Sequence, residues 1–444
     1  MCSIVEEDFG DDGGVHAMIE NPKITEITDE VCKKCNVEKS VIKLNFKEPQ
    51  CTECFLTYVR HKFKASLGTT KIIRQGSNVL LSFNAGPEST CLLDMVRFSY
   101  EREGAWKRLN FSTTLVYVDE HIVTEIGIDV TKRFNQIEKV KLLLEQYPNF
   151  KCYYSSIAGF TKELPLITEV TLAQVEDIII SEQTFLKTLN STISLTSRQD
   201  FIITSRNDVL RQIASNLSCQ YVFLSDITLT LAKRLISNIS LGRGSSVAND
   251  VAFCDDHIDS VKFVRPIRDI SLKEIAGYIK FNNIRTLDNQ QEYGSDSGQF
   301  ASIQNLTSNF VDGLQENFSS TVSTVYRTCA KISASNEAPP PVNSSILLEN
   351  LKHFKTKDME ARCLLCKNFL DYHNAETLFA IEYSRFVSEV SDNIDNAEVE
   401  KTKVQDKAMS AVHGDGHHIK KQLCHGCRNI FIELDDDDLE SVFL

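Results

Sequence analysis

The stretch NVLLSFNAGPESTCLLDM, residues 78–95, decides the fold of this chain. Val79, Leu80 and Leu81 form a short apolar run that predicts a buried strand, and the turn NAGPES ends it. From Ser89 onward apolar residues recur at helical spacing, which predicts a helix. A strand that turns sharply into a helix points backbone N–H groups at whatever lies above the turn, and this arrangement suits a phosphate. The plain alternative is a strand–helix connection capped by Ser89 or Asn84.

The region around this stretch, about 65–333, alternates strands and helices. We expect strands at 78–83, 112–118, 150–154, 221–224 and 261–264, and helices at 89–100, 129–145, 172–189, 200–217, 229–239 and 271–281. Strands separated by helices of this length predict an α/β fold, with a mainly parallel sheet and helices on both faces. Ligands of such sheets bind beyond the carboxyl ends of the strands. This rule places the turn, Asp119 and Asp226 along one rim.

Cysteine usage predicts metal sites. Eight of the 14 cysteines fall in four C-x-x-C pairs, namely Cys32/Cys35, Cys51/Cys54, Cys363/Cys366 and Cys424/Cys427. The start, MCSIVEEDFGDDGG, lacks the apolar core of a secretion signal, so we expect a reducing compartment and metal rather than disulfides. The first two pairs have the spacing C-x2-C-x15-C-x2-C of a structural zinc site, in which four thiolates close a tetrahedron around one Zn²⁺.

The second two pairs are separated by 57 residues, and one further Zn(Cys)4 site is the simplest explanation for them. His417, His418 or His425 could replace a thiolate, although surface histidines are the commoner case. The chain thus divides into six parts: a disordered acidic start at 1–25, a zinc module at 26–64, the α/β domain at 65–333, a polar insertion in it at about 289–310, a proline-rich linker at 334–345, and a second zinc module with a disordered insertion and acidic tail at 346–444.

Charge is distributed unevenly along the chain. The formal net charge of −13 argues against indiscriminate nucleic-acid binding. A local basic segment could nevertheless contact phosphates; its residues are Arg60, Lys62, Lys64, Lys71 and Arg74. The alternative is a solvated helix face whose buried side is Phe55, Val59 and Phe63. No run of about 18 apolar residues predicts a membrane span.

Together these motifs resemble a known family. The turn NAGPES is similar to the SGGxDS pyrophosphate-binding loop (PP-loop) of ATP-pyrophosphatases, with Ala85 and Gly86 at the glycine positions and Glu88 and Ser89 at the aspartate and serine. With CKKC…CTEC, the LVYVD strand, ISLGRG, VRPIRDISLKEIAGYIKF and CLLC…CHGC, most of the chain resembles the cytoplasmic tRNA 2-thiolation protein 2 family. The resemblance implies a PP-loop (HUP-like) domain, in which Asn84, Ala85, Gly86, Glu88, Ser89 and Asp119 would form the degenerate nucleotide loop and rim.

The resemblance also implies a cytoplasmic heterodimer with tRNA 2-thiolation protein 1, the catalytic subunit. The pair would 2-thiolate the wobble uridine (mcm5s2U) of tRNA-Lys, tRNA-Glu and tRNA-Gln. The sulfur would come from a ubiquitin-like modifier with a C-terminal thiocarboxylate. The uridine O2 would be activated by adenylation, and sulfur would then displace AMP.

Departures from the active pattern argue that this chain does not use ATP catalytically by itself. Ala85 narrows the loop, Pro87 removes an N–H donor, and no lysine compensates phosphate charge. Residues 65–333 also lack a cysteine pair. We therefore expect no catalytic residues here and a role in tRNA binding and dimer stability. Two alternatives remain: an independently active ATP-dependent sulfurtransferase with Ser89 and Gly86 on phosphate and Asp119 near Mg²⁺ or ribose, and a zinc-stabilised scaffold that binds neither nucleotide nor tRNA.

Overall fold

A computed structural model gives the structure of the chain. It describes residues 30–44, 48–101, 110–124, 129–159, 163–192, 194–244, 247–258, 260–287, 302–329, 362–368, 370 and 422–430. The predicted acidic start, the proline-rich linker, the insertion of the second zinc module and the acidic tail lie outside these residues. Among the described residues, no helix combines the length and apolar character that crossing a membrane requires.

One six-stranded sheet organises the described residues, in the order β3-β2-β1-β4-β6-β5. The strands are β1 (Ser77–Ser82), β2 (Phe111–Asp119), β3 (Cys152–Ser156), β4 (Tyr221–Phe223), β5 (Cys254–Asp255) and β6 (Lys262–Val264). All neighbouring pairs are parallel except β5 with β6, which is an antiparallel edge. The prediction of a mainly parallel sheet is therefore confirmed, and β5 is an addition to it.

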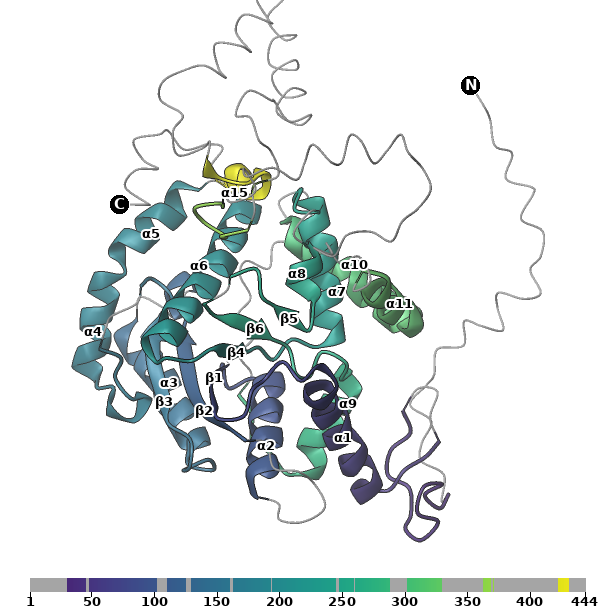
Figure 1. The fold of residues 1–444 in the computed structure, drawn as a ribbon. Helices are drawn as coiled ribbons and strands as arrows, with labels where there is room; N and C mark the ends of the chain where they lie inside the picture. Colours follow the sequence, from purple (N-terminus) through teal and green to yellow (C-terminus); the bar gives the residue numbers. More distant parts are fainter. Residues whose placement is uncertain are drawn as a thin grey trace, which may run out of the picture.

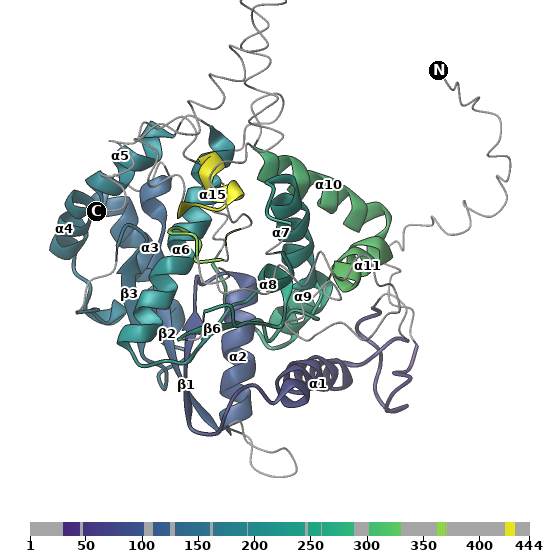
Figure 2. The same cartoon turned by 45° about the horizontal axis from the view of Figure 1, so that its top comes forward.

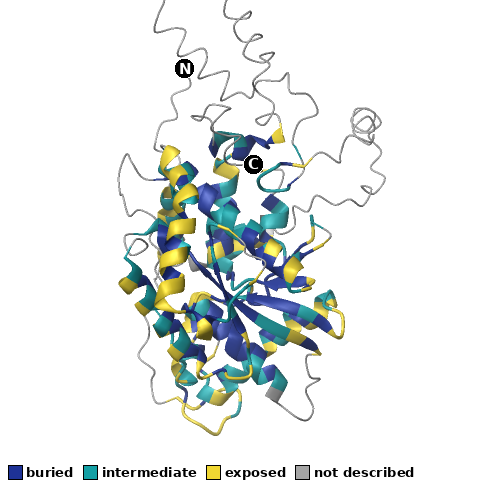
Figure 3. Ribbon diagram, turned by 90° about the vertical axis from the view of Figure 1, so that its left-hand side faces the viewer, coloured by how far each residue is buried: buried dark blue, intermediate teal, exposed yellow. Residues whose placement is uncertain are grey.

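Helices cover both faces of the sheet, as Figure 1 shows. They are α1 (Thr52–Thr70), α2 (Pro87–Glu101), α3 (Val130–Leu144), α4 (Leu172–Ser181), α5 (Gln183–Ser191), α6 (Leu195–Asn216), α7 (Thr228–Ser240), α8 (Val247–Val251), α9 (Leu272–Phe281), α10 (Ile303–Asn317), α11 (Ser319–Cys329) and α15 (His425–Ile430), with the 3₁₀ turns η2 (His121–Val123) and η3 (Ile167–Glu169). Figure 3 shows the strands buried between them.

The two faces have separate cores because successive strand residues point to opposite sides. Leu81 of β1 belongs to the core formed with α1, α2, α3 and α9. Leu80 belongs to the core formed with α6 and with the C-terminal cysteines. The carboxyl ends of the parallel strands thus open between two packed helix layers, and the candidate site lies there.

Several element boundaries differ from the prediction. The helix expected at 172–189 is two helices, α4 and α5, which change direction at Glu182, a residue whose carboxylate is buried against Arg133. The helix expected from Asp200 begins at Leu195, because Ser194 caps it. The polar insertion expected at about 289–310 is helical from Ile303, where α10 begins with Ser302 as its cap. The polar composition of residues 289–310 concealed this helix, although its exposed side chains include Leu306 and Phe310.

The first predicted zinc module is continuous with the α/β domain. Helix α1 starts directly after Cys51 and runs through the boundary predicted at 64/65. Its buried residues recur every four positions, at Phe55, Val59, Phe63 and Leu67. This stripe packs on α9, where Phe55 meets Phe281 edge-on with ring centroids 5.6 Å apart.

Candidate functional site

The NAGPES turn lies between β1 and α2, at the carboxyl edge of the sheet, as predicted. Two of its N–H groups, those of Asn84 and Gly86, are directed inward to the turn itself. The Asn84 side-chain oxygen Oδ1 accepts hydrogen bonds from the Gly86 backbone N–H at 3.0 Å and from the Ser89 hydroxyl at 2.6 Å. Ala85 adopts φ of 61°, a left-handed conformation that a side chain disfavours. The Asn84 carboxamide thus occupies donors that an anion would need.

Asp119 ends β2, and its side chain is 0% exposed. Its carboxylate accepts hydrogen bonds from Arg133 Nε at 2.8 Å and from the Tyr154 hydroxyl at 2.6 Å, and its other oxygen lies 2.7 Å from His121 Nδ1. Burial alone would raise the pKa of Asp119, but the Arg133 charge, His121 and Tyr154 together hold it below its usual range. Asp119 is therefore committed to the interior and is not presented to a metal or ribose.

Arg133 and Glu182 belong to this network, and the sequence reasoning missed them. Arg133 donates from both terminal nitrogens to Glu182, at 2.6 and 2.7 Å. Arg133 lies four residues before Ile137 and seven before Val140, so it falls on the apolar face of α3. A charge at that position is the signal that would have revealed the buried ion pair.

The second rim carboxylate, Asp226, is also neutralised. Arg234 donates to both of its oxygens, at 2.7 and 2.9 Å, and Arg265 Nε lies 3.1 Å away. Burial would raise the pKa of Asp226, and the two guanidinium groups lower it. Both predicted rim carboxylates, Asp119 and Asp226, are therefore held by arginines of the fold.

The basic segment divides into two parts. Arg60 donates to the Tyr278 hydroxyl at 3.2 Å and to Asn282 Oδ1 at 2.9 Å, and Lys62 pairs with Glu274 at 2.8 Å. These two side chains fasten α1 to α9.

Lys71 and Arg74 are exposed beyond the end of α1, and Lys64 is half-buried on the helix. The predicted five-residue patch is thus reduced to these three for any contact with tRNA.

Each group of four cysteines comes together. The sulfur atoms of Cys32, Cys35, Cys51 and Cys54 lie within 4.8 Å of one another, and so do those of Cys363, Cys366, Cys424 and Cys427. In both groups the residue after the second cysteine has a positive φ, 53° at Asn36 and 62° at Lys367. The backbone N–H of that residue donates to the carbonyl of the first cysteine. Both sites are therefore built on the same tight cysteine turn.

The second cysteine group is docked on the α/β domain by the motif ISLGRG. Arg243 pairs with both oxygens of Asp200 on α6, and its Nη2 lies 3.5 Å from Cys427 Sγ. Gly242 has φ of 78°, and a Cβ there would lie 2.5 Å from the ring of His425. His425 is thus packed against the motif and lies outside the group of four sulfur atoms.

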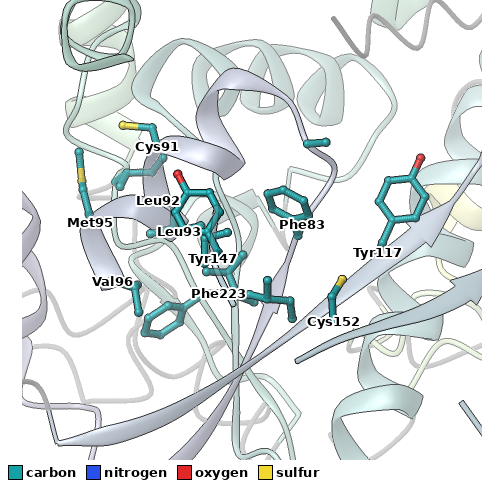
Figure 4. Close-up of a cluster of buried hydrophobic side chains, with 14 of the residues drawn as sticks. Phe83, Cys91, Leu92, Leu93, Met95, Val96, Tyr117, Tyr147, Cys152 and Phe223 are labelled. Atoms are coloured by element: carbon teal, nitrogen blue, oxygen red, sulfur yellow. The ribbon is translucent and has the colours of Figure 1, made fainter. Parts of the chain in front are cut away.

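Four further cysteines, Cys91, Cys152, Cys219 and Cys254, are thiols with raised pKa values. Cys91 lies on α2 within the apolar cluster of Figure 4, and burial raises its pKa well above the usual value. Burial likewise raises the pKa of Cys152, and it raises the pKa values of Cys219 and Cys254 to about 11. A sulfur nucleophile needs a thiolate at neutral pH, so none of these four is poised for sulfur transfer.

Comparison with known proteins identifies the family. The family model described as cytoplasmic tRNA 2-thiolation protein 2 matches residues 302–429. Proteins of that name from Aedes aegypti and Anopheles gambiae are 42% and 41% identical, and the matches span 98% of this chain and all of each relative. The chain belongs to the cytoplasmic tRNA 2-thiolation protein 2 family.

A solved structure confirms the fold expected of this family. The U34-tRNA thiolase NcsA from Methanococcus maripaludis, determined with its [4Fe-4S] cluster, superposes with a TM-score of 0.50 at 15% identity. The similarity covers 72% of this chain and 94% of the thiolase. At that identity the resemblance shows a shared fold alone, so the fold of this member of the tRNA 2-thiolation protein 2 family is that of a tRNA thiolase.

Proposed function

We propose that this chain is a subunit of a cytoplasmic complex that 2-thiolates tRNA, and that it supports an active partner without adenylating tRNA itself. Membership of the tRNA 2-thiolation protein 2 family supports the process and the substrate class. The observation that carries the division of labour is the closed NAGPES turn, in which Asn84 takes the donors of Gly86 and Ser89. The raised pKa values of the described cysteines outside the metal groups agree with it.

The partner and the sulfur source are part of the same proposal. We expect a heterodimer with tRNA 2-thiolation protein 1, whose nucleotide loop would activate the uridine O2 with ATP. Sulfur would come from the thiocarboxylate of a ubiquitin-like modifier. The substrate would be the wobble uridine of tRNA-Lys, tRNA-Glu and tRNA-Gln. The shared fold with a U34-tRNA thiolase supports the wobble position.

Zinc is the metal we propose for both cysteine groups. Four thiolates around one Zn²⁺ with Zn–S of about 2.3 Å lie roughly 3.8 Å apart. The Cys35–Cys51 sulfur distance is 3.8 Å and the Cys366–Cys424 distance is 3.6 Å. A [4Fe-4S] cluster would hold its thiolates farther apart, because each binds a different iron. With four thiolates each, both sites would be closed and structural.

The activity of the separate subunits tests the proposal. We expect this chain alone, given ATP, Mg²⁺ and tRNA, to release no pyrophosphate, and the heterodimer to release it. Ser89→Ala should leave pyrophosphate release by the heterodimer unchanged, because Ser89 only closes the turn. The equivalent serine in the partner's loop is the matched control and should be essential. Pyrophosphate release by the isolated chain that Ser89→Ala abolishes would instead establish an independent sulfurtransferase.

A further inference from the structure

A cavity of about 310 Å³ lies apart from the NAGPES turn. Its walls come from α6, α7, the ends of β4 and β6, and the Cys366 turn of the second cysteine group. None of residues 84–89 lines it. In Figure 2, α6 and α7 stand on either side of this region with α15 close to α6, and α15 contacts α6 directly. Its volume is at the lower end of the range for small-molecule sites.

Cationic side chains dominate the cavity wall. Six of them line it, namely Arg206, Arg211, Lys233, Arg234, Arg243 and Arg265, against the carboxylates Asp200, Asp250 and Asp255. Glu120, Asp226 and Asp312 pair with members of this set but do not line the cavity. Arginine forks suit phosphate. Five of the six cations already form ion pairs with carboxylates, so an anion in this cavity would bind through Arg211 and the donors that the paired arginines have left.

Arg211 is the cation whose charge is least compensated. Its guanidinium stacks on the Phe263 ring at 4.7 Å, and no described carboxylate forms an ion pair with it. Burial lowers its pKa, and Asp255 and Asp208 only partly offset this effect. Arg211 is half-buried, and its donors are free of carboxylate partners among the described residues, so they can bind an anion that enters the cavity.

Buried acceptors without partners belong to residues that line the same cavity. His257 Nδ1 donates to the Asp255 carboxylate, and the His257 side chain is 4% exposed, yet its Nε2 has no partner among the described residues. The side-chain oxygens of Gln304 and Asn368 are also buried and unpaired in that part of the chain. All three residues line the cavity. Hydroxyl or amino groups of a ligand would satisfy them.

We propose that this cavity binds a free mononucleotide, with its phosphate on the arginines around Arg211 and its ribose or base donors on His257, Gln304 and Asn368. The volume of about 310 Å³ is sufficient for one nucleotide. The site is separate from the turn between β1 and α2, so this proposal does not depend on whether that turn contacts ATP.

Calorimetric titration of the purified full-length chain with AMP, ATP and inorganic pyrophosphate tests the proposal. We expect AMP and ATP to bind and pyrophosphate to bind at least about tenfold more weakly, because it lacks the nucleoside donors. Arg211→Gln should weaken AMP binding at least about tenfold, and Arg211→Lys should weaken it less, since it keeps the charge but loses the planar fork. Arg327→Gln, at an exposed position on α11, is the matched control and should not change it.

A second variant avoids the core. Thr230 is exposed and lines the cavity in the first turn of α7. Thr230→Glu therefore places a negative charge at the cavity, and the first turn of a helix tolerates an acidic residue. It should weaken AMP binding severalfold without loss of thermal stability. Ser89→Ala should leave AMP binding unchanged. The proposal fails if AMP does not bind at millimolar concentration, if pyrophosphate or tRNA binds in its place, or if only Ser89→Ala abolishes binding.

Discussion

Asp119 and Arg133 show how a rim carboxylate becomes structural. Both side chains are 0% exposed, and the pair lies 2.8 Å apart in a network that includes Glu182 and Tyr154. Removing one member of a buried pair leaves an uncompensated charge, which costs far more than the pair contributes. The residue that would serve Mg²⁺ or ribose in an active loop therefore stabilises the fold.

We expect Asp119→Asn to lower the free energy of unfolding by about 1–3 kcal/mol, because Arg133 Nε and the Tyr154 hydroxyl lose a charged acceptor, whereas Glu182 still neutralises the Arg133 charge. Urea denaturation of the purified chain measures this change. Asp129→Asn is the matched control: Asp129 caps α3 by accepting from the Lys132 N–H, and asparagine caps equally well. Equal losses in the two variants would contradict the structural role of Asp119.

The same carboxylate gives the stability a dependence on acid. The pKa of Asp119 is lower in the folded than in the unfolded chain, so its stabilisation is complete above the unfolded value of about 3.9. It is lost as the pH falls from there through the folded pKa. We expect the wild-type chain to lose stability more steeply below about pH 4 than Asp119→Asn does, in urea titrations at several pH values.

Two glycines, Gly242 in ISLGRG and Gly426 in CHGC, allow the second cysteine group to pack against the α/β domain. Gly242 ends α7 with a positive φ and touches His425, whereas Gly244 has open space around it. Gly426, at the start of α15, leaves no room for a Cβ beside Arg243. The motifs ISLGRG and CHGC therefore pack closely because each has a glycine where the other motif contributes a side chain.

Gly242→Ala should destabilise this docking by about 1–3 kcal/mol, from backbone strain and the clash with His425. We expect the second cysteine group of this variant to lose its metal to a chelator faster than in the wild type. A colorimetric chelator measures the rate of metal release. Gly244→Ala, two residues away, should release metal at the wild-type rate. Equal rates in both variants would show that the motif does not hold the second group.

The two cysteine groups tie both ends of the described chain to one body. Cys51 and Cys54 begin the helix that packs on α9, and Cys363, Cys424 and Cys427 belong to the core around α6. We expect about two zinc ions per chain and no stoichiometric iron by elemental analysis. Cys35→Ser and Cys366→Ser should each remove about one ion. Iron with visible charge-transfer absorbance would contradict the zinc assignment.

We expect contact with tRNA to be a property of the proposed heterodimer. The charge reversals Lys71→Glu and Arg74→Glu together should weaken tRNA binding severalfold and reduce its salt dependence by up to about two counterions. Filter binding over a salt series measures both effects. Lys139→Glu, at an exposed position on α3, is the control for a general change of charge. Unchanged binding in the double variant would make these residues a solvated face.

The sequence by itself determined the parallel α/β fold, the NAGPES turn at the sheet edge and both groups of four cysteines. These features depend on short-range patterns: alternating strands and helices, a small-residue break, and fixed C-x-x-C spacing. The same local information failed at 303–310 and at Glu182, where contacts with distant elements decide the helix limits.

Only the tertiary structure decided what the rim residues do. Asp119 pairs with Arg133, 14 residues along the chain, and Asp226 pairs with Arg265, 39 residues along the chain. Arg60 and Lys62 bind residues of α9 or at its end, more than 200 residues away in the sequence. The residues that line the cationic cavity come from separate helices and strand ends, so no single stretch of sequence indicates the cavity. Whether a charge is a ligand or a structural partner depends on which opposite charge the fold brings within about 4 Å, and sequence spacing does not encode that distance.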